Sequence, residues 1–114
     1  MNERKLVRDK IPDLIRADGL NPVVYTAAPD EYAVRLRDKL REETAEFLAA
    51  NADVRTGDDD SLQELADVLE VVYALAEDIG AGRERLETVR AAKAARNGAF
   101  TKRLVWSGNT TGTD

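Results

Sequence analysis

The chain of 114 residues contains no cysteine and no histidine. The first absence excludes disulfides, thiolate nucleophiles and zinc–thiolate sites. The second excludes the Ser–His triad, imidazole acid–base catalysis and most transition-metal sites. Any catalytic chemistry must therefore use carboxylates, lysine, arginine, tyrosine or hydroxyl groups.

Aromatic residues are also scarce, at 5% of the chain, and most of the apolar residues are alanine, leucine and valine. Because this composition favours helices, we expect an all-α fold, a bundle of about four helices. The length predicts one domain, residues 1–106. Residues 107–114 carry no apolar side chain, so we expect a disordered tail there.

Long hydrophobic runs are missing as well. No stretch approaches the roughly 18 to 20 apolar residues of a membrane span, and the N-terminus lacks the apolar core of a signal peptide. We therefore expect a cytoplasmic protein with no membrane partner. The net charge of −5 argues against binding a nucleic-acid polymer, but a single nucleotide needs only a few local cations.

Start and stop signals divide the chain into helices. Pro12 and Gly19 bound a short first helix, and a long helix runs from about Asp30 to Asn51. The next helix follows the acidic loop 53–60 and ends at Gly80, and the last covers about Arg83 to Arg96. Two short β-prone runs, 23–26 and 104–106, predict a minor two-stranded ribbon.

Two pairs of acids lie on the central helices, Glu43 with Glu46 and Glu64 with Asp67. A spacing of three residues places both members of a pair on one helix face. Antiparallel packing of the two helices would bring four carboxylates together. An all-oxygen set of this kind suits Mg²⁺, with Mn²⁺ as a substitute.

The hydrophobic pattern supports this interpretation for Glu43. It lies seven residues after Leu36 and four before Phe47, on the apolar stripe of its helix. Burying a carboxylate there is costly unless something pairs with it. Clustered carboxylates repel one another in a low dielectric, and a cation relieves that repulsion.

Structural roles are the alternative for the same acids. Ser61 and Glu64 have the spacing of a capping box, although an overlapping box of Asp60 and Gln63 would leave Glu64 free. On the first central helix, Glu42 and Glu43 have the spacing to pair with Lys39 and support the helix.

The same acids form the pattern EExxE…ExxD, in residues 42–46 and 64–67. It resembles the signature of the MazG-like all-α nucleoside triphosphate pyrophosphohydrolases. The segments 5–12 and 93–100 resemble the flanks of the small phosphoribosyl-ATP pyrophosphohydrolase-like branch of that group. The resemblance covers roughly residues 4 to 106.

This resemblance implies a hydrolase that cleaves a nucleoside triphosphate between its α and β phosphates, releasing a monophosphate and pyrophosphate. Glu43, Glu46, Glu64 and Asp67 would hold Mg²⁺. Glu42 or Glu46 would act as general base beside Glu43, and Arg8, Lys93 and Arg96 would bind the phosphates. Lys93 and Arg96 also fall on the apolar stripe of the last helix, seven residues after Leu86 and Val89 respectively.

A homodimer or homotetramer is expected for two reasons. Residues 68–76 are apolar on nearly all sides, which a single four-helix chain of this size does not cover. Proteins of the resembling group also associate in this way. Two other functions stay open: a phosphoribosyl-ATP pyrophosphohydrolase of histidine biosynthesis, and a non-catalytic helical interaction module.

Overall fold

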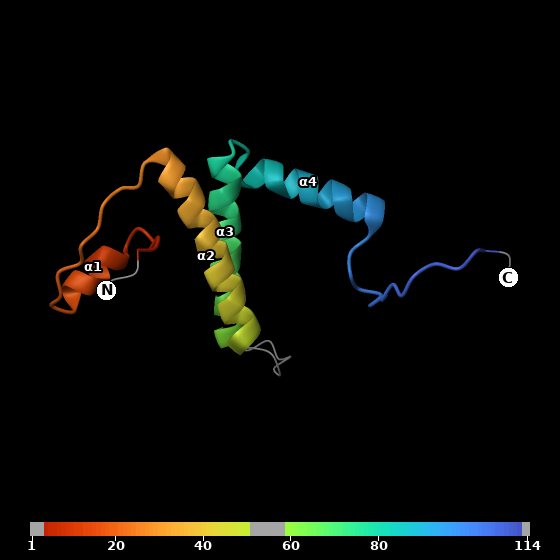
Figure 1. The fold of residues 1–114 in the computed structure, drawn as a ribbon, viewed down its shortest axis with the longest axis horizontal. Helices are drawn as coiled ribbons and strands as arrows, with labels where there is room; N and C mark the ends of the chain where they lie inside the picture. Colours follow the sequence, from red (N-terminus) through yellow and green to blue (C-terminus); the bar gives the residue numbers. More distant parts are fainter. Residues whose placement is uncertain (1–3, 51–58, 113–114) are drawn as a thin grey trace.

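The computed structural model describes residues 4–50 and 59–112, and this part of the chain is all-α (Figure 1). It forms four helices: α1 (Ile11–Ala17), α2 (Pro29–Ala50), α3 (Asp59–Asp78) and α4 (Gly82–Asn97). The predicted all-α class and the four helices are confirmed. None of the described helices is long and apolar enough to cross a membrane.

The helix ends follow local signals. Pro12 lies in the first turn of α1, and the chain leaves that helix through Gly19, whose φ of +85° is easily adopted only by glycine. α3 ends in a Schellman motif at Gly80: the Ala81 N–H donates to the Ala76 carbonyl and the Gly80 N–H to the Glu77 carbonyl, both at 2.9 Å.

The centre of the molecule is the antiparallel pair of α2 and α3 (Figure 1). Leu36 of α2 is only 3% exposed, and Val71 and Ala76 of α3 are also buried. α4 packs against α3 alone, whereas α1 packs against none of the other helices. Among the described helices, the contact between α2 and α3 is therefore the most extensive, and it fixes how these two helices face each other.

The single chain is open rather than compact. Its radius of gyration is 19.1 Å, whereas a compact domain of this length has one of about 13 Å. Among the described residues, no large side chain is completely buried. Figure 1 shows why: α4 leaves the end of the α2–α3 pair as a separate arm, and the C-terminal segment extends beyond it.

The predicted ribbon and capping boxes are not found in the described residues. Residues 4–50 and 59–112 contain no strand, and the two segments expected to pair, 23–26 and 104–106, lie at opposite sides of the molecule (Figure 1). Neither capping box stands at a helix start, because α3 already begins at Asp59. The predicted acidic loop lies mostly outside the described residues, as do residues 113–114 of the predicted tail; residues 107–112 contain no helix.

Candidate functional site

Three of the four predicted metal ligands meet between α2 and α3. Glu43, Glu64 and Asp67 each offer a carboxylate oxygen, and these oxygens lie within 4.8 Å of one another. Two oxygens bound to one Mg²⁺ at about 2.1 Å are at most about 4.2 Å apart. Adjacent ligands of an octahedral Mg²⁺ are only about 3.0 Å apart, so the side chains would have to move closer together before one ion could bind all three carboxylates.

The cluster contains two buried oxygens that have no hydrogen-bond partner, Oε2 of Glu43 and Oε2 of Glu64. Glu43 as a whole is only 7% exposed. Two carboxylates at such separations repel by on the order of 3 kcal/mol even at an effective dielectric constant of 20. Buried acceptors of this kind need a hydrogen-bond donor or a cation. Three carboxylate ligands and their negative charge therefore fit a hard divalent ion.

Internal cations neutralise part of this charge. The Lys39 Nζ lies 3.2 Å from Glu43 Oε1, which confirms the spacing argument for that pair. The Arg8 guanidinium donates to Asp67 at 2.7 Å. Arg8 therefore contacts a carboxylate of the cluster, and its role as a phosphate ligand stays a prediction.

Glu42 and Glu46 flank Glu43 on α2, and their environments differ. Burial acts to raise the pKa of Glu42, but the ammonium groups of Lys39 and Lys5 outweigh it, so the pKa is lower than usual. The pKa of Glu46 is raised, mainly by the charge of Glu43 and then by burial and by Glu42 and Glu64. Glu46 thus feels the cluster, although its oxygens are not among those that converge within 4.8 Å.

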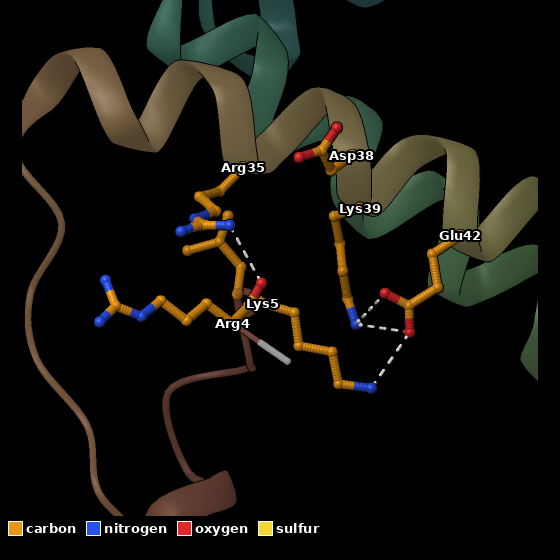
Figure 2. Close-up of a pocket in the computed structure, with 7 residues that line it drawn as sticks. Arg4, Lys5, Arg35, Asp38, Lys39 and Glu42 are labelled. Carbon is orange, nitrogen blue, oxygen red and sulfur yellow. Dashed lines mark hydrogen bonds and ion pairs between the residues drawn. The ribbon is translucent and has the colours of Figure 1, made fainter. Parts of the chain in front are cut away.

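One hollow opens onto the cluster, and a second lies one helical turn away along α2. One, of about 370 Å³, is lined by Ala50, Asp60, Gln63, Glu64 and Asp67, so two of the candidate ligands are open to it. The other, of about 500 Å³, lies between the N-terminal segment and α2 and includes Lys39 and Glu42 in its lining (Figure 2). A ligand in the first hollow can therefore contact two of the carboxylates, whereas the second hollow is connected with the cluster through Lys39, which pairs with Glu43.

Lys93 and Arg96 are not near this cluster in the single chain. Both are exposed and belong to the C-terminal half of α4. That part of α4 points away from the α2–α3 pair (Figure 1). The fold of one chain therefore does not bring these predicted phosphate ligands to Glu43.

Sequence reasoning missed Lys5 and gave Lys39 only a helix-supporting role. Lys39 had a local signal, its spacing of four from Glu43. Lys5 had none, because its contact with Glu42 joins residues that are 37 positions apart. Only the path of the N-terminal segment across α2 creates that contact.

Comparison with known proteins gives little beyond this geometry. The chain is 55% identical over 47 residues to a protein of Mycolicibacterium smegmatis described as uncharacterized. The match covers 41% of this chain and 48% of that protein, so it spans about half the length of the relative. No family model matches the chain, and no solved structure does.

Proposed function

We propose that this protein is a metal-dependent pyrophosphohydrolase that cleaves a nucleoside triphosphate between the α and β phosphates. The observation that carries the proposal is the meeting of Glu43, Glu64 and Asp67, with two buried carboxylate oxygens that lack a partner. The resemblance of residues 42–46 and 64–67 to the EExxE…ExxD signature supplies the reaction class. A cytoplasmic location would give the enzyme access to nucleotides.

Glu43, Glu64 and Asp67 would hold Mg²⁺, and Glu46 would join them or contact a bound water. When bound, the ion would neutralise phosphate charge and favour ionisation of a nearby water. In the proposed reaction, the oxygen of a water molecule would attack the α phosphorus as the bond from this phosphorus to the bridging oxygen breaks. Pyrophosphate leaves with the electron pair of that bond.

The proton of the attacking water needs an acceptor, for which the sequence offered Glu42 and Glu46. Glu46 is the better candidate, because it is exposed and lies three residues after Glu43, so its carboxylate can take up a proton beside the cluster and release it to solvent. Glu42 is held by Lys5 and Lys39, and its lowered pKa makes it a weaker base. We therefore assign the base to Glu46.

A second copy of the chain would complete the molecule as a homodimer or homotetramer. On α3, three leucines spaced along one side remain about half exposed: Leu62, Leu65 and Leu69. The C-terminal segment exposes Phe100 at 95% and Trp106 at 80%. Surfaces of this kind mark an interface. In such an assembly, Lys93 and Arg96 would bind substrate phosphates at the carboxylate cluster of a neighbouring copy.

The direct test is pyrophosphate release from a panel of nucleoside triphosphates with Mg²⁺, with Mn²⁺ and with chelator. We expect metal-dependent release with a monophosphate as co-product. Glu43→Gln combined with Glu64→Gln should lower activity at least about a hundredfold, more than is typical for the loss of an outer-shell partner. It should also remove the rise in melting temperature that Mg²⁺ gives by binding the folded state.

Glu70→Gln is the matched control, because Glu70 is an exposed acid on the same helix as Glu64. It should keep both activity and the Mg²⁺ effect. Full activity in the Glu43/Glu64 double variant would contradict the proposal. Cleavage of phosphoribosyl-ATP alone would favour the histidine-biosynthesis enzyme, and the absence of both cleavage and any metal effect would favour the interaction module.

A further inference from the structure

The hollow between the N-terminal segment and α2 is basic, although the chain is acidic overall. Four cationic residues line it, Arg4, Lys5, Arg35 and Lys39, against two acids, Asp38 and Glu42. The chain as a whole carries a net charge of −5. The lining residues therefore carry an excess of two positive charges, while Glu31 and Glu43, which lie outside the lining, pair with Arg35 at 2.9 Å and with Lys39 at 3.2 Å. An excess of cations that face a hollow favours an anionic ligand there.

Two of the cations already converge on one point. The ammonium groups of Lys5 and Lys39 lie 3.3 and 3.5 Å from the same oxygen, Oε1 of Glu42. Figure 2 shows both side chains reaching this carboxylate from opposite walls of the hollow. Ammonium groups arranged around one oxygen are suited to a phosphate oxygen, since both acceptors are anionic and form charge-assisted hydrogen bonds.

Lys39 connects this hollow with the carboxylate cluster. Its ammonium group lies 3.2 Å from Glu43 as well as 3.5 Å from Glu42, and its side chain is only 18% exposed. A cation bound at Glu43 would take over the neutralisation of that carboxylate. Lys39 would then be free to contact a ligand in the hollow, one helical turn from the metal ligand.

The wall formed by the N-terminal segment is attached by polar contacts. Lys5 pairs with Glu42, Arg8 pairs with Asp67, and the Arg4 carbonyl accepts a hydrogen bond of 3.1 Å from Arg35. Val7 is partly exposed, and α1 beyond it packs against no other helix. Exposed ion pairs contribute little to stability, so this wall can adjust when a charged ligand replaces them.

We infer that the basic hollow of Arg4, Lys5, Arg35 and Lys39 binds the phosphates distal to the cleavage point, with Lys5 and Lys39 as their principal ligands. This inference rests on the proposed function, because it orients the triphosphate from the carboxylate cluster towards the N-terminal segment. The same hollow then holds the pyrophosphate product before it leaves.

The test is titration of the full chain with inorganic pyrophosphate by calorimetry, with Mg²⁺ and with chelator. Lys5→Gln and Lys39→Gln should each weaken binding about tenfold, the size of one lost charge-assisted contact. Arg37→Gln is the control, because it removes one charge from α2 at an exposed residue that does not line the hollow. It should change the affinity less than about twofold.

Loss of Lys39 can also disturb the neighbouring Glu43, with which it pairs. Lys5→Gln leaves that pair intact and therefore tests the hollow alone. Inorganic phosphate serves as a second probe and should bind more weakly than pyrophosphate, because it spans fewer contacts. Unchanged affinity for pyrophosphate in Lys5→Gln, or no binding of pyrophosphate by the wild type, would overturn the inference. If triphosphate hydrolysis is absent but pyrophosphate binding depends on Lys5, the hollow stands and the proposed reaction does not.

Discussion

The α2–α3 pair buries a charged side chain, whereas the α4 arm exposes apolar side chains. The pair buries a carboxylate, Glu43, and leaves it without a full set of partners. The arm and the segment after it leave valine and aromatic side chains exposed, including Val89 and Phe100. Each arrangement is unfavourable in water for its own reason, the first through unpaired charge and the second through exposed apolar area.

The difference indicates what each region lacks. A cation would satisfy the carboxylates of the pair, whereas only another protein surface would cover the apolar side chains of the arm. One assembly would place both features together if the α4 arm of one copy packed near the carboxylate cluster of another copy.

The strongest test asks whether the arm serves a neighbouring copy. Lys93→Gln combined with Arg96→Gln should lower triphosphate hydrolysis about a hundredfold, because two phosphate contacts of about tenfold each are lost. An equal mixture of this variant with the Glu43→Gln/Glu64→Gln variant, after subunit exchange, should recover about a quarter of wild-type activity. This is the statistical share of intact sites in a random mixture of dimers.

Recovery requires that cluster and arm come from different chains. If both came from one chain, no site in the mixture would be intact and activity would stay at the level of the separate variants. The control is the same mixture at a concentration below the dissociation constant of the assembly, where recovery should disappear.

A weaker but more direct effect concerns the leucines of α3. Leu65→Glu adds a charge among Leu62 and Leu69, and it should raise the dissociation constant of the assembly at least tenfold, because that charge would lose its water in the interface. Sedimentation velocity over a dilution series measures this shift. Ala17→Glu adds the same charge to an exposed position of α1, which packs against none of the other helices, and serves for comparison. A wild-type chain that is monomeric at every concentration would disprove the interface.

Much of this molecule was predictable from local sequence. The helix ends follow from Pro12, Gly19 and Gly80, whose conformational preferences act within a turn. The burial of Glu43 followed from its distance of seven residues from Leu36, which is also buried. In both cases the evidence lies within two turns of one helix, where spacing alone fixes direction.

The remaining features depend on contacts between distant segments. The contacts of Arg8 with Asp67 and of Lys5 with Glu42 join residues 59 and 37 positions apart. The direction of α4 depends on how the chain turns after Gly80, which no periodicity encodes. The expected ribbon shows the same limit, because β-prone residues do not specify a partner strand.

The smallest expected effect comes from Glu46, which flanks the cluster. Its raised pKa means that the folded state binds its proton more tightly than the unfolded state does. Stability is therefore lost as the pH rises above the ordinary glutamate pKa of about 4.3, and none is lost below it. In chelator, Glu46→Gln should raise the melting temperature at pH 7 by roughly 1 to 3 °C and leave it unchanged near pH 4. Saturating Mg²⁺ should shrink the gain at pH 7, because the ion offsets the charge of Glu43 that raises this pKa.

Glu84→Gln, at an exposed acid of α4, should show neither the gain nor its dependence on Mg²⁺. Equal melting temperatures of wild type and Glu46→Gln at pH 7 in chelator would mean that Glu46 does not interact with the cluster, and the assignment of the general base would fall with it.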